Sequence, residues 1–297
     1  MRLIILSLVF ILSCKSGNSE KGGKTYQALN LQSVHQFIST DSLNFDFSGI
    51  VQKDDSIYVV ADKPWNTFIY SIEFDDQGWY VNHKRQIISQ QRFDLEAIDF
   101  CEGKFFLANE YTGSVYMLNP GEINLQELDI NFEEHNLNPG SWKNAGWEGL
   151  AIDSQNEIMY LTKERQPRII IAVDMKSWKI QDQFNIPQTE SNDFADAKFE
   201  NGYLYLLERN GNYITKINPT TKEVITKYHY RHIASHPDGK LYEPEKYGMA
   251  EALLLTEQEI WVGLDNNGLE VSNHARKVYQ LKSKEPVLLK FERPENF

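Results

Sequence analysis

Three glutamates recur at one position of a repeated motif, and their type and number indicate a shared cation site. The second residues of the five motif copies, here called the first column, are Ser48, Glu96, Glu148, Ala195 and Glu251. Three carboxylates in one narrow opening raise one another's pKa unless a cation or hydrogen-bond donors lie between them. Ca²⁺ binds about six to eight oxygen atoms. The candidate ligands are backbone carbonyls together with Glu96, Glu148, Glu251, Asp196 and Asn144.

A structural role is the alternative for the same carboxylates. Each Glu would then accept backbone N–H bonds from an adjacent repeat unit and hold the two units together. Both roles stay open at this point, and different glutamates can serve different roles.

A second column of charged residues lies shortly after the next apolar run of each repeat and consists of Lys63, Glu110, Glu164, Arg209 and Asp265. Its mixed signs are compatible with a ring of ion pairs that compensate one another. They are also compatible with a polar rim that binds a small anionic or sugar-like ligand. Trp142 lies in a long loop, 133–146, and has no counterpart in the other repeats. Because long loops on a rigid scaffold often carry binding residues, Trp142 joins the ligand candidates.

The elements that must position these residues are β-strands. The motif recurs at 47–50, 95–98, 147–150, 194–197 and 250–253, in steps of 47 to 56 residues. This period is typical of a four-stranded propeller blade with loop insertions. A polar turn and a second apolar run follow each copy, at 57–61, 105–108, 159–162, 204–207 and 260–263. Turn residues between two apolar runs predict hairpins.

The predicted fold is all-β, a single β-propeller domain over residues 26–297 with five four-stranded blades. Five copies from residue 47 onward leave no room for a sixth full blade. Residues 26–46 can add a strand that closes the ring against the last blade, which removes an exposed edge. Small residues at the third motif position, such as Gly49 and Gly149, fit inner strands that converge near an axis.

The N-terminus is predicted to be an export signal. Arg2 precedes an apolar run over residues 3–12, which is too short to span a bilayer and typical of a secretory signal. The run ends at Cys14 in a sequence that resembles a bacterial lipobox, in which the cysteine becomes the lipidated N-terminus. We therefore expect a signal peptide at 1–13 and a flexible tether at 14–25. The expected location is the bacterial cell envelope, with the lipid in a membrane and the domain in the periplasm or on the outer-membrane surface.

The composition limits the possible partners. The chain of 297 residues has a formal charge of −12, or −13 once residues 1–13 and Arg2 are removed. Nucleic-acid binding requires clustered cations, so it is not expected. Cys101 is the single cysteine of the domain, and we expect a buried, unreactive thiol. We expect a monomer without an organic cofactor, whose partner is a small ligand or an envelope protein.

Several motif stretches resemble the SdiA-regulated family of exported bacterial propellers: 47–50, 62–64, 94–100, 144–152, 163–167 and 249–254. The resemblance covers about residues 30–285, and its most specific part is Asn-x-Gly-aromatic-Glu-Gly-Leu-Ala at 144–151. It implies a five-bladed propeller without an established biochemical activity. A more distant resemblance, to the esterase-like phytase group, implies an ester or phosphoester substrate. The fourth copy departs from the pattern at Ala195 and Asp196.

Two functions are compatible with these observations. The first is a lipid-anchored binding or scaffold module with a Ca²⁺ ion near the central channel, and it is favoured because no nucleophile elbow of the Gly-x-Ser-x-Gly type occurs. The second is a cation-dependent hydrolase of an ester, lactone or phosphoester, in which the ion polarises the substrate and activates a water molecule.

Overall fold

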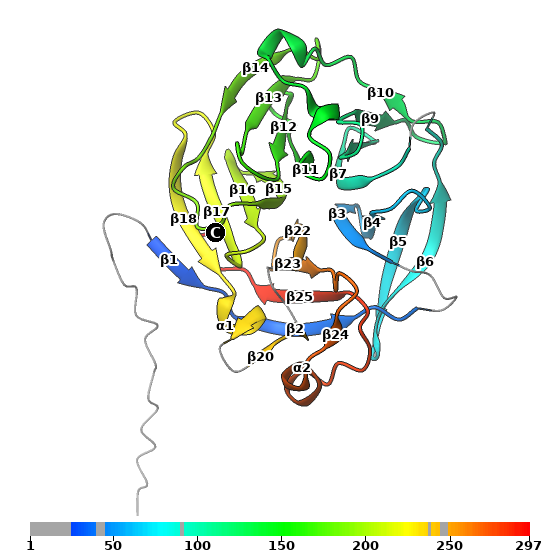
Figure 1. Cartoon of the computed structure of the whole chain (residues 1–297), viewed down its shortest axis with the longest axis vertical. Helices are drawn as coiled ribbons and strands as arrows, with labels where there is room; N and C mark the ends of the chain where they lie inside the picture. Colours follow the sequence, from blue (N-terminus) through cyan, green and yellow to red (C-terminus); the bar gives the residue numbers. More distant parts are fainter. Residues whose placement is uncertain (1–24, 40–44, 90–91, 237–238, 244–248) are drawn as a thin grey trace, which may run out of the picture.

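Five antiparallel sheets surround a central axis, and one strand of each sheet lies nearest to that axis (Figure 1). The structure is a computed structural model that describes residues 25–39, 45–89, 92–236, 239–243 and 249–297. The innermost strands contact one another in ring order, from the first blade to the fifth and back to the first. The prediction of an all-β propeller with five four-stranded blades is therefore confirmed.

The first three blades each contain four consecutive strands. Blade one consists of β3 (Phe47–Lys53), β4 (Ser56–Ala61), β5 (Phe68–Asp75) and β6 (Gly78–Gln86). Blade two consists of β7 (Leu95–Cys101), β8 (Lys104–Asn109), β9 (Val115–Leu118) and β10 (Gln126–Glu127). Blade three consists of β11 (Trp147–Asp153), β12 (Ile158–Lys163), β13 (Ile170–Asp174) and β14 (Ile180–Phe184).

The N-terminal strands complete the last two blades. Blade four consists of β15 (Phe194–Glu200), β16 (Tyr203–Glu208), β17 (Tyr213–Asn218) and β18 (Glu223–His229), with β1 (Thr25–Ala28) added parallel to β18. Blade five consists of β22 (Ala250–Leu255), β23 (Glu259–Leu264), β25 (Val287–Glu292) and β2 (Leu31–Gln36). The predicted closure of the ring is confirmed, because β2 pairs antiparallel with β25.

Short elements lie in the connections between strands. The long loop before blade three contains two 3₁₀ turns, Glu133–His135 and Pro139–Ser141. Helix α1 (Arg231–Ala234) follows β18, and helix α2 (Asn273–Val278) precedes β25. Two small ladders accompany them: β19 (Ser235–His236) with β20 (Gly239–Lys240), and β21 (Tyr242–Glu243) with β24 (Glu270–Val271).

Close approach of the inner strands explains the small residues in the motif. A Cβ atom on Gly149 would lie 2.7 Å from the backbone nitrogen of Ala197 in the next blade, closer than real contacts allow. At the junction of blades five and one, a Cβ atom on Gly263 would lie 1.9 Å from the Phe47 ring. The expected crowding of the inner strands is therefore present at Gly149, and the second strand of blade five is crowded by Phe47 at Gly263.

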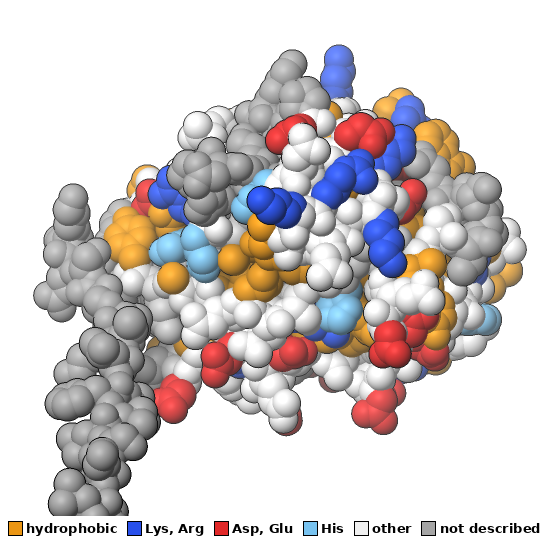
Figure 2. Space-filling view, turned by 90° about the horizontal axis from the view of Figure 1, so that it is seen from below, with side chains coloured by type: hydrophobic (Ala, Val, Ile, Leu, Met, Phe, Trp, Pro, Cys, Tyr) orange, Lys and Arg blue, Asp and Glu red, His pale blue; other side chains and the backbone are white. Residues whose placement is uncertain are grey.

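Charged side chains are unevenly distributed over the face of the molecule that carries β2 and α2. Seen from the side of β2 and α2, Asp and Glu side chains gather along the lower edge, whereas Lys and Arg side chains lie mainly above it (Figure 2). Cys101 is buried, as predicted. The predicted signal peptide, Cys14 and nearly all of the tether lie outside the described residues. Within the described part of the chain, no helix is long and apolar enough to cross a membrane.

Candidate functional site

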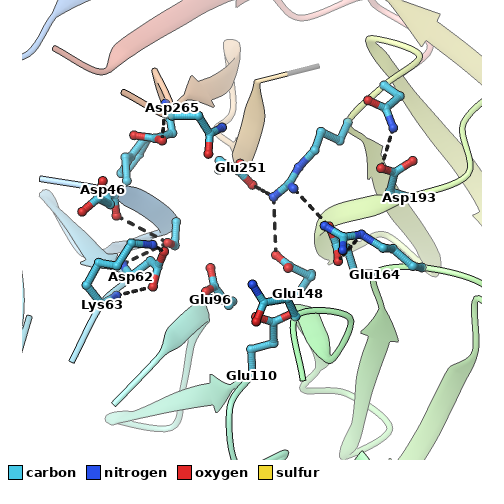
Figure 3. Close-up of a pocket in the computed structure, with 17 residues that line it drawn as sticks. Asp46, Asp62, Lys63, Glu96, Glu110, Glu148, Glu164, Asp193, Glu251 and Asp265 are labelled. Carbon is cyan, nitrogen blue, oxygen red and sulfur yellow. Dashed lines mark hydrogen bonds and ion pairs between the residues drawn. The ribbon is translucent and has the colours of Figure 1, made fainter. Parts of the chain in front are cut away.

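One end of the channel opens into a strongly acidic cavity of 560 Å³, here called the mouth cavity (Figure 3). Nine carboxylates and three basic side chains line it. The acidic residues are Asp46, Asp62, Glu96, Glu110, Glu148, Glu164, Asp193, Glu251 and Asp265, and the basic residues are Lys63, Arg165 and Arg209. A ligand of the cavity must therefore supply positive charge or hydrogen-bond donors to these carboxylates.

A repeated β-bulge directs the first column into the mouth cavity. In all five blades the register between the two innermost strands shifts at the second motif residue, so that this residue is the extra one in its strand. Bulges re-aim side chains and are frequent beside functional sites. Glu96, Glu148, Glu251 and Ser48 line the cavity. Ala195 occupies the fifth bulge without a polar side chain.

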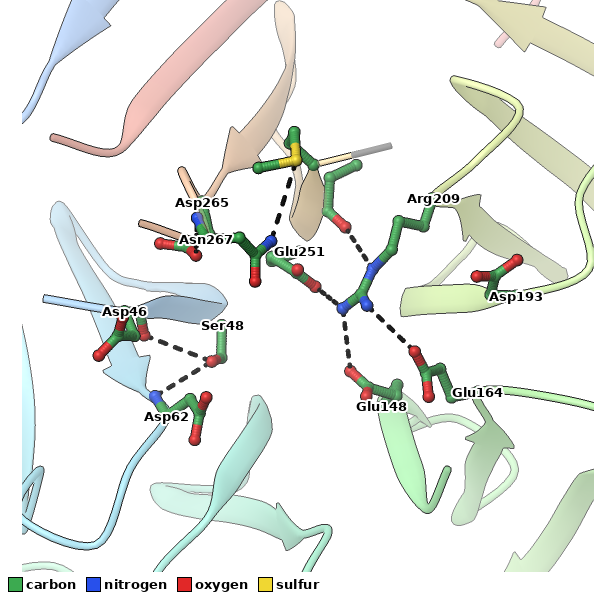
Figure 4. A network of polar contacts seen from close by, with 12 residues as sticks. Asp46, Ser48, Asp62, Glu148, Glu164, Asp193, Arg209, Glu251, Asp265 and Asn267 are labelled. Atoms are coloured by element: carbon green, nitrogen blue, oxygen red, sulfur yellow. Dashed lines mark hydrogen bonds and ion pairs between the residues drawn. The ribbon is translucent and has the colours of Figure 1, made fainter. Parts of the chain in front are cut away.

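Arg209 is the central positive charge in the half of the cavity that contains Glu148, Glu164 and Glu251 (Figure 4). Its guanidinium donates to Glu164 Oε1 at 3.0 Å and to a carboxylate oxygen of Glu251, and it lies 3.9 Å from Glu148 Oε2. Its Nε also donates to the Ala250 carbonyl at 3.4 Å. Burial opposes the charge of Arg209, but the three carboxylates raise its pKa above its ordinary value. The predicted ion pairs of the second column are present here, and they include glutamates of the first column.

Glu96 lies in the other half, without a basic partner. It is 8% exposed and forms no ion pair among the described residues. Burial raises the pKa of its carboxyl well above the ordinary value, and the charges of Glu110 and Asp94 raise it further, while a hydrogen bond from Ser48 lowers it. Carboxylate oxygens of Glu96, Asp62 and Asp94 all lie within 4.8 Å of one another. Three acidic groups so close need protons or a cation.

A second acidic group lies beside Arg209. Oxygens of Glu110, Glu148 and Glu164 also lie within 4.8 Å of one another. Burial raises the pKa of Glu110 to about 7. The hydrogen bond that its Oε1 accepts from the Gly146 N–H at 3.0 Å lowers this pKa but does not offset the effect of burial. Burial raises the pKa of Glu148 well above its ordinary value, and the charge of Glu96 adds to this, whereas Arg209 opposes it. The cation of this group is Arg209, whereas the Glu96 group has only Lys63, which is 41% exposed and pairs with Asp62.

The predicted ligand Asp196 does not line the mouth cavity. It is fully buried, and its Oδ2 accepts from the Leu253 N–H of blade five at 2.7 Å. Lys198 donates to Asp196 Oδ1 at 3.2 Å and to the Ile98 carbonyl of blade two at 3.1 Å. Burial raises the pKa of Asp196 to about 7, and Lys198 lowers it. The geometry of Asp196 is therefore that of the alternative role, a contact between blades.

The two remaining candidates of the loop before blade three differ in position. Asn144 lines the mouth cavity. Trp142 does not line it and packs edge-on against Trp147, with a ring distance of 4.9 Å. The Lys163 ammonium lies 5.1 Å from the Trp142 ring. Trp142 is thus half-buried in a contact between side chains.

Backbone hydrogen bonds define the second column and show a third column that the sequence analysis missed. The N–H groups of Glu110, Glu164 and Asp265 donate to the residue just before the inner strand of their own blade, and in blade one Asp62 makes this bond. Asp62, not Lys63, is thus the equivalent position, and Lys63 forms an ion pair with it. The residues before the five inner strands, here called the third column, are Asp46, Asp94, Gly146, Asp193 and Met249. An aspartate at this position in three of five copies was the available signal.

Comparisons with known proteins agree with this architecture. Residues 30–231 match the model of the SdiA-regulated family. The crystal structure of glutaminyl cyclase from Myxococcus xanthus is similar with a TM-score of 0.61 and 8% sequence identity, over 90% of this chain and 97% of that one. A chain of the nidogen/laminin complex has a TM-score of 0.48 and 11% identity, over 81% and 79%. No curated protein matches the sequence. At 8% identity the similarity to glutaminyl cyclase shows the fold alone.

Proposed function

We propose that this chain, which belongs to the SdiA-regulated family, is a lipid-anchored binding module of the bacterial cell envelope whose channel mouth holds a Ca²⁺ ion. The apolar run at 3–12 is followed by Cys14 in a sequence typical of a lipidated N-terminus, and this pattern supports the anchor. The binding role rests on the mouth cavity, a concave and polar feature of 560 Å³.

The observation that carries the cation proposal is the environment of Glu96. Its carboxylate is buried, it has no basic partner among the described residues, and it shares a 4.8 Å cluster with Asp62 and Asp94. Oxygen-only donor sets of this kind favour hard cations, and Ca²⁺ tolerates irregular geometry better than Mg²⁺ does. A bound Ca²⁺ would replace the protons that the raised pKa values otherwise require.

The rest of the cavity indicates the chemistry of the ligand. Arg209 is engaged by three glutamates, so it offers little to an anion. Ionised carboxylates of the cavity lining accept hydrogen bonds and do not donate them. A hydroxyl-rich, sugar-like ligand would supply donors to these carboxylates and an oxygen to the ion. Of the two ligand classes expected for this rim, the sugar-like class therefore has the better support.

Calorimetric titration with Ca²⁺ tests the cation. We expect Glu96→Gln to remove one bound ion per chain, because the amide keeps the shape but loses the charge. Glu257→Gln is the matched control, since Glu257 is an exposed carboxylate on a turn of blade five, and it should bind Ca²⁺ as the unchanged protein does. Equal stoichiometry and affinity in Glu96→Gln and in the control would refute the mouth site.

A second candidate function, a cation-dependent hydrolase, is supported by one observation. Glu110 faces the mouth cavity and has a pKa of about 7, which is close to the optimum for a general base at neutral pH. The assay is a panel of esters, lactones and phosphoesters with Ca²⁺ present. Turnover that Glu110→Gln abolishes while the fold persists would favour the hydrolase, and no turnover on any substrate would favour the binding module.

A further inference from the structure

The junction between the last blade and the first carries two aspartates that the mouth ion does not use. Asp265 follows the second strand of blade five, and Asp46 precedes the inner strand of blade one. Both line the mouth cavity, and Figure 4 shows them on the side away from Arg209. The inner strands β22 and β3 meet at this junction, where the ring of blades closes.

Each aspartate has one carboxylate oxygen without a hydrogen-bond partner. Asp265 is 6% exposed, and its Oδ2 accepts from the Asn267 N–H at 2.7 Å, whereas its Oδ1 is buried and accepts no hydrogen bond. Asp46 Oδ2 is also buried and without a partner. Buried carboxylate oxygens are normally satisfied, so two such atoms at one junction need an explanation.

The charges around the pair do not supply a full counter-charge. Burial raises the pKa of both aspartates, that of Asp265 to about 6, and the charge of Asp46 adds to the effect on Asp265. Lys63 is the basic group that acts on both, but its ammonium pairs with Asp62 and its side chain is 41% exposed. Glu285 adds a further negative charge near Asp46.

We propose that Asp46 and Asp265 hold a second Ca²⁺ ion at the junction of blades five and one. The two unpartnered oxygens are hard anionic donors, and the side-chain carbonyl of Asn267 is a neutral oxygen donor that Ca²⁺ also accepts. The Asn267 amide nitrogen faces Met249 Sδ at 3.9 Å, and Figure 4 shows its oxygen on the opposite side, toward the cavity. Water molecules in the open cavity would complete the coordination.

This ion would stabilise the contact between blade five and blade one that closes the ring. Its two carboxylate ligands come from blades at opposite ends of the sequence, so binding couples the two ends of the chain in the folded state only. A ligand that binds only the folded protein stabilises it by mass action. The second ion has ligands of its own, because neither aspartate belongs to the cluster of Asp62, Asp94 and Glu96.

Calcium titration of the full chain, monitored by calorimetry, tests the inference. We expect two ions per chain in the unchanged protein and one in Asp265→Asn, whose amide oxygen can still accept the Asn267 N–H. Glu96→Gln should keep the junction ion. Asp46→Asn is the second variant if Asp265→Asn does not fold. As a second measurement, Ca²⁺ should raise the melting temperature of Glu96→Gln but not that of Glu96→Gln combined with Asp265→Asn.

The outcomes separate the two proposals. Loss of one ion in Asp265→Asn and of the other in Glu96→Gln supports both sites. A single ion that only Asp265→Asn removes supports the junction site and refutes the mouth site. A single ion that only Glu96→Gln removes, or unchanged binding in Asp265→Asn and Asp46→Asn, overturns the junction site.

Discussion

Replacing Arg209 by Met should destabilise the protein strongly at alkaline pH and much less at pH 6. Arg209 is the cation between Glu148, Glu164 and Glu251, and its side chain is 12% exposed. Met keeps much of the aliphatic volume and removes the charge. Removing one partner of a buried ion pair typically costs about 3–5 kcal/mol, because the remaining charges stay buried.

The pH dependence follows from the glutamates. Burial raises the pKa of Glu251 to about 8, although Arg209 lowers it, and the pKa rises further when Arg209 is absent. A carboxyl whose pKa is raised in the folded state stabilises the fold at low pH, and this contribution is lost as pH rises toward the folded pKa. In the variant the loss continues to higher pH than in the unchanged protein. The difference in unfolding free energy between the variant and the unchanged protein therefore grows above pH 7 and reaches about 3–5 kcal/mol near pH 9.

Urea unfolding at pH 6 and pH 9 in the presence of a chelator measures this difference. For a protein of this size the loss at pH 9 corresponds to a fall in melting temperature of about 6–20 °C. The matched control is Arg165→Met. Arg165 contacts Glu164 at 2.9 Å, but its side chain is 54% exposed, so the expected loss is about 0–1 kcal/mol. A loss below about 1 kcal/mol for Arg209→Met, or equal losses at both pH values, would refute the reasoning.

Three further predictions follow from the same structure. Without Ca²⁺, the unfolding free energy should fall as pH rises from about 4 to about 8, because burial raises the pKa of Glu110 to about 7 and that of Glu251 to about 8; urea titrations across pH measure this, and a rise in that range contradicts it. Gly263→Ala should cost about 1–3 kcal/mol by overpacking, because the new Cβ would lie 1.9 Å from the Phe47 ring; an unchanged melting temperature would show that the ring moves freely. Cys14→Ser should abolish metabolic labelling with a fatty-acid analogue while the domain stays folded, and persistent labelling would exclude Cys14 as the anchor.

The repeat in the sequence was sufficient to predict the architecture of the blades. A motif with a period of 47 to 56 residues fixed the number of inner strands, and the apolar runs after each motif fixed their hairpin partners. Ring closure by β2 also followed, because an open fifth blade would leave an exposed edge strand. The parallel addition of β1 to blade four was not predicted, since residues 25–28 carry no pattern that selects one edge over another.

The candidate site could be predicted in part. The first column was correctly located by its position in the motif, although the β-bulge that places it there has no mark in the sequence. Asp196 is the third residue of its motif copy, and the bulge residue of the column is the second. Its side chain therefore contacts the Leu253 N–H of the next blade and does not line the mouth cavity. Lys63 was chosen in place of Asp62 because column membership depends on a backbone hydrogen bond, which spacing alone does not reveal.

The electrostatic partners could not be predicted from spacing. Arg209 contacts glutamates that are 42 to 61 residues away in the sequence, and only the ring arrangement brings them together. Trp142 has no repeat counterpart, which made it a surface candidate, yet its ring packs on Trp147. Unpaired charges such as Glu96 become visible only when the neighbours of each carboxylate are known.

The pairing of β2 with β25 has a consequence for biosynthesis. Gln36 lies opposite Val287, so the last blade needs two strands that are separated by all the other blades in the sequence and are synthesised at different times. The nascent chain cannot complete blade five while it is still being translated, and a truncated product would retain two unpaired strand edges. Contacts between such distant segments also slow folding.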